Sequence, residues 1–518
     1  MRFRWFRAFL AVPLVVLAGA APAAAAPVQP SPPAPASTLE ADLDRILSDP
    51  RLNADHTGLV VRDPTSHQVV YSRNGDRPET PASNVKLLTS AAAMDVLGPE
   101  HRFRTDVLAS GQRQGPVLHG DLHLRGTGDP TTLPADYDRL AAQVAASGVR
   151  QVQGRLLTDD TYFDAQRHAK GWSPDDETSY YGAPVSALTA APDTDYDPGS
   201  VIVRVSPGEA GQPARAELAP QTGAVQVVNE ATTGAAGSPS SLSVQREPNS
   251  PRIVVRGAVP AGTAPANEYV SVPDATAYAG DLFARSLAAH DVSVGPVAPA
   301  PTPQDARQLA THQSMTLREM LVPFLKLSNN GHAEALTKAM GRAERGQGSW
   351  EAGTAVIEQR VRAYGVDPAT LSLTDGSGLS RLDSVPPEQF GRLLDAARQR
   401  PWFRSWYDAL PIAGEPDRMV GGTLNDRMAG TAAQGNVHAK TGSMTGVTSI
   451  SGYATGADGR QLVFSSLFNG FSSEPPQDLE DAVAVRLAQE GGPAPSTREL
   501  PRLSSPHPAV DAKRAHQR

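Results

Sequence analysis

The most constraining feature of this sequence is a change in the pattern of apolar residues partway along the chain. Residues 84–97 and several segments between 316 and 489 carry apolar residues at helical spacing, whereas residues 106–302 show short alternating segments separated by glycine and proline. Strand-rich sequence between two helical parts indicates inserted material. At 518 residues the chain is also longer than one hydrophobic core usually supports, so two or three domains are expected.

The expected division of the chain follows this change. Residues 1–26 have the features of a secretion signal, because arginines precede an apolar run and an alanine-rich segment. The predicted parts are a signal peptide (1–26), a discontinuous main domain (38–105 and 303–491), an inserted α/β domain (106–193 and 263–302), a nested β-rich domain (194–262) and a disordered Pro-rich tail (492–518).

The two ends of the chain are expected to share one sheet. Two segments, 57–62 and 67–72, indicate a hairpin, and a strand bearing Lys440 precedes two more strands at 447–455 and 461–468. The predicted helices are 84–97, 316–327, 331–344, 350–364, 386–399 and 476–489. The fold class is therefore α+β and multidomain, with a five-stranded antiparallel sheet that has helices on both faces.

Composition excludes several kinds of protein. The chain has no cysteine, which rules out a thiol nucleophile, thiolate metal sites and disulfides. Its net charge of -8 argues against nucleic acid as a partner. The apolar run near the N-terminus is short and contains Pro13, so we expect a cleaved signal and a secreted, extracytoplasmic protein without a stable membrane span. An uncleaved anchor is the alternative.

Lysine is scarce, and one lysine stands three residues after a serine. Of the six lysines, only Lys86 has this spacing, in Ser83-Asn84-Val85-Lys86. On a helix the two side chains share one face, and a desolvated lysine can become a neutral amine that accepts the hydroxyl proton, which an arginine cannot do. The pair is a candidate nucleophile and base, although one such spacing also arises by chance.

A second lysine opens the segment Lys440-Thr441-Gly442-Ser443 just before strand-like sequence. A glycine there keeps a strand edge clear for an extended peptide. We expect Lys440 and the hydroxyls of Thr441 and Ser443 to hold a substrate carboxylate, and the backbone N–H groups of Ser443 and Ser83 to form an oxyanion hole. An ordinary turn is the alternative.

Ser328-Asn329-Asn330 lies between two predicted helices, where capping alone explains it. A catalytic interpretation makes Ser328 a proton relay between the two lysines, with Asn330 binding a substrate amide. Two other patterns are weaker. His119 and His123 fit a pair of strands better than a metal site, and residues 375–378 (DGSG) fit a tight loop.

The order Ser-x-x-Lys, Ser-x-Asn, Lys-Thr-Gly resembles the class C low-molecular-mass penicillin-binding proteins, the D-alanyl-D-alanine carboxypeptidase and endopeptidase family. The resemblance spans roughly residues 40 to 490, with Asn329 where the usual signature has aspartate. Supporting segments are TPASNVKLLTSAAAMDVLG (80–98), GTGDPTT (126–132), YYGAPVSAL (180–188), TDGSGLSR (374–381) and HAKTGSMTGV (438–447). The long separation of Ser83 from Ser328 suits a family with inserted domains better than a typical β-lactamase.

The resemblance implies a serine peptidase that forms an acyl-enzyme on peptidoglycan stem peptides, needs no cofactor or metal and is acylated by β-lactams. The residues it implies for catalysis are Ser83, Lys86, Ser328, Asn330 and Lys440. The pocket that it implies for a diaminopimelate side chain consists of Trp172, Asp175, Tyr180, Arg381, Met444 and Thr445. A β-lactamase and a non-catalytic peptidoglycan-binding protein are the alternatives. The motifs do not indicate the oligomeric state or the balance between carboxypeptidase, endopeptidase and transpeptidase activity.

Overall fold

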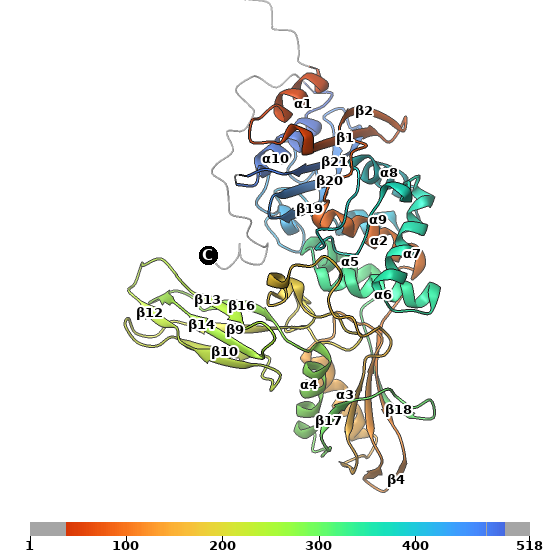
Figure 1. Cartoon of the computed structure of the whole chain (residues 1–518), viewed down its shortest axis with the longest axis vertical. Helices are drawn as coiled ribbons and strands as arrows, with labels where there is room; N and C mark the ends of the chain where they lie inside the picture. Colours follow the sequence, from red (N-terminus) through yellow and green to blue (C-terminus); the bar gives the residue numbers. More distant parts are fainter. Residues whose placement is uncertain (1–37, 473, 493–518) are drawn as a thin grey trace, which may run out of the picture. The chain divides into compact units, whose positions relative to one another are not determined.

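In the computed structural model of the chain, the described residues are 38–472 and 474–492 (Figure 1). The expected signal peptide and all but the first residue of the expected tail lie outside these ranges. No helix within the described ranges is both long and apolar enough to cross a membrane.

The five-stranded sheet joins the two ends of the chain, as predicted. Its strand order is β19-β20-β21-β1-β2, and every neighbouring pair is antiparallel. The strands are β19 (His438–Met444), β20 (Val447–Thr455), β21 (Gln461–Asn469), β1 (Thr57–Asp63) and β2 (Gln68–Arg73). Strand β19, which carries Lys440, therefore forms one edge of the sheet.

Helices cover both faces of this sheet because its central strands are apolar on both sides. In β21, Leu462 and Phe464 pack in the cluster that includes α1 (Leu39–Leu47) and α10 (Gln477–Ala488). Val463, which points to the other face, belongs to the cluster of the remaining helices. Figure 1 shows α1 and α10 on one side of the strands and α2, α8 and α9 on the other.

The second helical layer holds the predicted helices with small changes at their ends. Its members are α2 (Val85–Val96), α5 (Leu317–Lys326), α6 (Asn330–Arg345), α7 (Trp350–Val361), α8 (Pro387–Ala397) and α9 (Phe403–Ala409). Helix α9 is only two turns long and was not predicted. Its Trp406 is fully buried and donates a hydrogen bond to Ser90 in α2 at 2.7 Å, so tertiary packing stabilises this short helix.

The strand-rich middle of the chain forms a second five-stranded sheet with the order β17-β8-β6-β3-β18. Its strands are β3 (Arg104–Ala109), β6 (Leu122–Gly126), β8 (Leu156–Asp159), β17 (Val297–Pro299) and β18 (Arg307–Gln313), and it is accompanied by α3 (Pro134–Ala146) and α4 (Ala275–Ala289). Since β3 pairs with β18, we propose that the insert extends from 104 to 313 and not from 106 to 302.

Smaller sheets complete the middle segment. The orders are β10-β9-β16, β11-β14-β13, β12-β15 and β4-β5-β7. Their strands are β4 (Gln112–Gln114), β5 (Val117–His119), β7 (Gln151–Val152), β9 (Ser200–Ser206), β10 (Arg215–Ala219), β11 (Gln226–Asn229), β12 (Thr232–Gly234), β13 (Ser243–Arg246), β14 (Arg252–Arg256), β15 (Ala258–Pro260) and β16 (Ala266–Ser271). Because β16 pairs with β9, we propose that the nested β-rich part continues past residue 262.

The two histidines of this region lie in two successive strands of the chain. His119 lies in β5 and His123 in β6, and these two strands belong to different sheets. His119 bonds Gln153, whereas His123 bonds Ser110. No cluster of potential metal ligands occurs among the described residues.

Candidate active site

The Ser83 side chain is presented by a tight turn at the start of α2. A single 3-10 turn, η2 (Ala82–Asn84), leads directly into the helix, and Ala82 has a left-handed φ of 46°. Lys86 follows in the first turn of α2, and its Nζ donates a hydrogen bond to Ser83 Oγ at 2.8 Å. The i, i+3 spacing therefore brings the two groups into contact, as expected.

Lys86 is fully buried, and its hydrogen-bond partners among the described residues are all neutral. Besides Ser83, its Nζ donates to Asn330 Oδ1 at 2.7 Å and to the Ser377 carbonyl at 2.8 Å. Burial lowers the pKa of Lys86 to about 7, against the opposing effect of Asp375 and Glu334, whose charges raise it. At neutral pH a large fraction of this lysine is therefore an uncharged amine.

Ser328 reaches the site from the connection between α5 and α6, and Asn330 reaches it as the first residue of α6. Ser328 has a left-handed φ of 57°, and its Oγ accepts a hydrogen bond from Lys440 Nζ at 2.8 Å. Asn330 accepts from Lys86 through Oδ1 and donates to the Tyr181 carbonyl at 2.9 Å through Nδ2. Within the described ranges, no hydrogen bond joins Ser328 to Lys86, so its relay role stays a prediction.

Asn329, the departure from the usual motif, faces away from the lysines. Its Nδ2 donates to the backbone carbonyls of Asp195 and Tyr196, at 3.2 and 2.7 Å, and to Asp197 Oδ1 at 3.0 Å. All three partners are acceptors, so this position requires an N–H donor. An aspartate could not make these bonds.

The edge strand β19 lies directly against the serine turn. A Cβ atom built on Gly442 would lie 2.8 Å from the Ser83 backbone nitrogen and 3.0 Å from the Pro81 carbonyl oxygen. Glycine is needed here because the two segments approach so closely. Ser443 follows and is exposed. The predicted pairing of the Ser83 and Ser443 N–H groups in an oxyanion hole is consistent with this proximity.

Lys440 is the second fully buried lysine of the site. In addition to Ser328, its Nζ donates to the Thr441 carbonyl at 2.6 Å. Burial, followed by the charge of nearby Lys86, lowers the pKa of Lys440 well below its ordinary value. The Thr441 hydroxyl pairs with the Thr423 hydroxyl at 2.6 Å.

The residues expected to bind a substrate side chain come from three segments. Arg381 is exposed and donates to the Thr445 carbonyl at 3.4 Å, beside the half-buried Met444. Asp175 is exposed in the 3-10 turn η3 (Pro174–Asp176), and no ion pair joins it to Arg381 in the part of the chain that the structure describes. Both charges are therefore available to a ligand.

The aromatic members of this predicted pocket are held by neighbouring groups. The Trp172 indole donates to Asp375 Oδ2 at 2.8 Å and makes an edge-to-face contact with Trp350. Tyr180, in the 3-10 turn η4 (Tyr180–Gly182), packs edge-to-face on Tyr181. The structure thus connects Trp172 to the loop that also contacts Lys86.

Two contributors to the site were missed from the sequence. The loop 375–378 is a tight loop, as predicted, but it also supplies the Ser377 carbonyl to Lys86. Its clustered glycines were the only sequence signal for such a role. Glu334 in α6 supports this loop by accepting hydrogen bonds from Gly376 and Ser377. Nothing in its sequence surroundings indicates this function.

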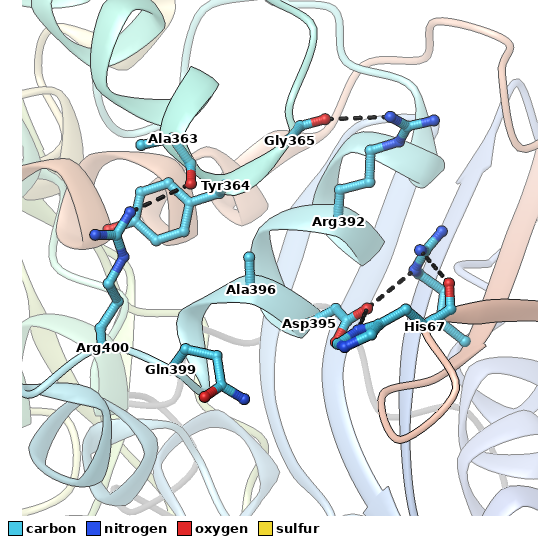
Figure 2. Close-up of a pocket in the computed structure, with 10 residues that line it drawn as sticks. His67, Ala363, Tyr364, Gly365, Arg392, Asp395, Ala396, Gln399 and Arg400 are labelled. Atoms are coloured by element: carbon cyan, nitrogen blue, oxygen red, sulfur yellow. Dashed lines mark hydrogen bonds and ion pairs between the residues drawn. The ribbon is translucent and has the colours of Figure 1, made fainter.

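A separate open cavity of about 610 Å³ contains none of the predicted site residues (Figure 2). Its basic side chains already have partners. Arg62 and Arg392 share Glu388, His67 pairs with Asp395, and Arg400 lies over the Tyr364 ring. Because it contains none of the serine, lysine and asparagine residues of the three motifs, this cavity is not the candidate active site.

Comparison with known proteins adds independent information. Residues 39–490 match the family described as the D-Ala-D-Ala carboxypeptidase 3 (S13) family. A D-alanyl-D-alanine carboxypeptidase from Actinomadura sp. (strain R39) is 46% identical over 460 residues, which cover 88% of this chain and 85% of that protein. The D-alanyl-D-alanine carboxypeptidase DacB of Haemophilus influenzae is 27% identical and covers 81% of this chain and 86% of its own.

Solved structures agree with the sequence relatives. The crystal structure of penicillin binding protein 4 (dacB) from Haemophilus influenzae superimposes with a TM-score of 0.73 at 25% identity, covering 86% of this chain and 97% of that one. A second crystal structure of the same protein, complexed with a novel β-lactam, gives a TM-score of 0.68 over the same shares of the two chains. The predicted fold class is therefore confirmed.

Proposed function

The chain belongs to the D-Ala-D-Ala carboxypeptidase 3 (S13) family of serine-type carboxypeptidases, and on that premise we propose that Ser83 is its nucleophile. The observation that carries this assignment is the 2.8 Å contact between Ser83 Oγ and Lys86 Nζ. The contact lies within hydrogen-bond reach for proton transfer, and burial brings the pKa of Lys86 to about 7.

Acylation uses these two groups. Ser83 Oγ attacks the carbonyl carbon of the penultimate D-alanine of a peptidoglycan stem peptide, and Lys86 takes the hydroxyl proton. The carbon–nitrogen bond then breaks, and the proton passes to the leaving D-alanine amine. Water attacks the resulting ester, its proton returns to Lys86 and thence to Ser83 Oγ, and the shortened peptide leaves. A cross-linked peptide whose leaving group is diaminopimelate would follow the same path, which is endopeptidase activity.

Substrate contacts are assigned around this centre. The N–H groups of Ser83 and Ser443 would receive the negative charge of the tetrahedral intermediate. Lys440, with the hydroxyls of Thr441 and Ser443, would bind the terminal carboxylate, and strand β19 would pair with the extended peptide. This arrangement is supported by the close packing of Gly442 on Ser83.

The side-chain pocket is assigned to diaminopimelate. Arg381 would bind the carboxylate and Asp175 the ammonium at the end of this side chain, while aromatic and thioether groups contact its aliphatic stem. The stem contacts would come from Trp172, Tyr180 and Met444, with Thr445 at the rim.

A family that acts on peptidoglycan works at the cell envelope. We infer that residues 1–26 export the protein and are removed, so that it is secreted and reaches its substrate outside the cytoplasm. β-Lactams would acylate Ser83 as analogues of the terminal dipeptide.

Two assays on one set of variants test the proposal. The wild-type protein should bind fluorescent penicillin covalently and release D-alanine from a muropeptide pentapeptide. Ser83→Ala should do neither, while Ser240→Ala, a change at an exposed serine, should do both. Covalent labelling of Ser83→Ala would disprove the assignment. Rapid loss of the label without D-alanine release would indicate a β-lactamase, and neither reaction in the wild type would indicate a non-catalytic binding protein.

A further inference from the structure

Two buried carboxylates close enough to Lys86 to influence its pKa make no ion pair within the described ranges. Glu334 and Asp375 are both fully inaccessible to solvent, and neither makes an ion pair with any lysine, arginine or histidine in the described ranges. A buried carboxylate without a counter-ion destabilises a fold unless hydrogen bonds compensate it. Such a pair beside a catalytic base therefore calls for a functional explanation.

Both carboxylates are surrounded by neutral N–H donors. Glu334 accepts from the Trp350 indole at 2.7 Å, from Gly376 N at 3.0 Å and from Ser377 N at 2.9 Å. Asp375 accepts from three backbone N–H groups of its own loop and from the Trp172 indole at 2.8 Å. Backbone N–H groups of the loop 375–380 thus donate hydrogen bonds to both carboxylates.

Ser377 connects this network to the base. Its N–H donates to both Glu334 and Asp375, and its carbonyl accepts from Lys86 Nζ at 2.8 Å. We propose that Glu334 and Asp375 are positioning residues that hold the Ser377 carbonyl against Lys86 and, through Asp375, fix Trp172 at the side-chain pocket. This inference rests on the proposed function, because it requires Lys86 to be the base.

The network reaches the pocket through two tryptophans. Trp350 and Trp172 are in edge-to-face contact with ring centroids 6.0 Å apart, and each donates its indole N–H to one of the two carboxylates. Lys338 Nζ lies 3.7 Å from the centroid of the Trp350 ring and donates a hydrogen bond to Asp164, so the ring has a further fixed neighbour. Base and pocket are therefore held by one hydrogen-bonded unit.

The charges also act on the base directly. Lys86 faces Lys440 on β19, Glu334 on α6 and Asp375 on the loop, and the two carboxylates raise its pKa against the effect of burial. Asp383 interacts with Asp375, and burial together with that neighbour raises the pKa of Asp383 well above its ordinary value. Burial, followed by the charge of Asp375, raises the pKa of Glu334 to about 7, so the Glu334 charge acts on Lys86 mainly at neutral pH and above, and removing it should lower the pKa of Lys86.

The test compares Glu334→Gln with Glu480→Gln. Glu480 is an equally buried glutamate that binds Arg427 and Thr448, on α10 and away from Lys86. The readout is the second-order rate constant for acylation by fluorescent penicillin between pH 5 and 9. Glu334→Gln keeps one acceptor oxygen, and its amide NH₂ meets either the N–H of Ser377 or the N–H groups of Gly376 and Trp350, so we expect acylation at pH 8 to slow by roughly 10- to 100-fold.

The pH profile separates positioning from a merely structural role. In Glu334→Gln the acidic limb of the profile, where the acylation rate falls as the pH is lowered, should move to lower pH. Glu480→Gln should keep the wild-type rate and the wild-type acidic limb. Glu334→Asp retains the charge and should keep the limb, even if its rate falls. A wild-type rate and profile in Glu334→Gln would overturn the inference, although Ser83 labelling in the wild type would still support the proposed function.

A milder variant tests the same inference if Glu334→Gln fails to fold. Trp350→Phe keeps an aromatic ring but removes the indole N–H that donates to Glu334. Loss of this hydrogen bond should raise the pKa of Glu334 and so favour its neutral form. We expect a few-fold slower acylation and a smaller shift of the acidic limb in the same direction. An unchanged rate and an unchanged limb in folded Trp350→Phe would likewise overturn the inference.

Discussion

Gly442 and Ser83 are in such close contact that no side chain fits between them. A Cβ atom on Gly442 would lie 2.8 Å from the Ser83 backbone nitrogen and would also collide with the Ser449 hydroxyl, which itself donates to the Pro81 carbonyl at 2.9 Å. The substrate-binding edge and the nucleophile are therefore parts of one packed unit, although the sequence separates them widely.

Replacing this glycine should damage catalysis more than folding. In Gly442→Ala, β19 must move away from the serine turn, which would displace the predicted oxyanion hole. We expect penicillin acylation to slow by roughly 100-fold, as for loss of an oxyanion donor. Gly208→Ala, at a glycine whose nearest neighbour would be 3.4 Å away, is the matched control and should acylate normally. Equal rates for the two variants would contradict the proposed packing role.

Acylation should depend on the protonation of Lys86. Because the base must be uncharged and its pKa is about 7, the rate should fall about tenfold for each pH unit well below 7 and level off above it. Stopped-flow measurements with a penicillin whose own charge is constant over this range would check the profile. A rate that is flat from pH 5 to 9 would exclude Lys86 as the base.

The same lysine should make stability rise with pH. Its folded pKa of about 7 lies below the ordinary value of 10.5, so between these two values the unfolded chain binds more protons than the folded one. The loss of folding stability caused by the lowered pKa of Lys86 is complete below pH 7 and disappears toward pH 10.5. Denaturation of the wild type and of Lys86→Met between pH 7 and 10 should therefore show a smaller rise with pH in the variant.

Restoring the usual motif should destabilise this protein. Asn329→Asp would place a carboxylate against three acceptors that now receive N–H donation, including Asp197. We expect a loss on the order of 3 kcal/mol in the free energy of unfolding, measured in urea. Adding Asp197→Asn, which supplies an amide donor, should recover part of that loss. An unchanged free energy of unfolding in Asn329→Asp would show that these hydrogen bonds contribute little to stability.

Arg381 should govern side-chain specificity without affecting acylation itself. Its guanidinium is exposed and bonds only the Thr445 carbonyl in the described part of the chain. We expect Arg381→Ala to lower kcat/KM for a diaminopimelate peptide about tenfold, while benzylpenicillin acylation stays within about twofold. Arg404→Ala, at an arginine that is 84% exposed on α9, is the control and should change neither value. Equal losses for both substrates would contradict the pocket assignment.

The sequence by itself determined what depends on neighbours along the chain. The spacing of Ser83 and Lys86 places both on one helical face, and short runs rich in apolar residues predict the strands of the main sheet. The absence of cysteine also excluded thiol chemistry from the start. These are properties of local geometry and composition, which need no knowledge of the fold.

Only the tertiary structure decided the electrostatics of the site. Lys86 meets the amide of Asn330 and the carbonyl of Ser377, and Glu334 supports that carbonyl from a different helix. None of these contacts has a local sequence signature. Burial is a sum over segments distant in sequence, and burial sets the pKa of Lys86, so the reactivity of this lysine arises only when the chain is folded.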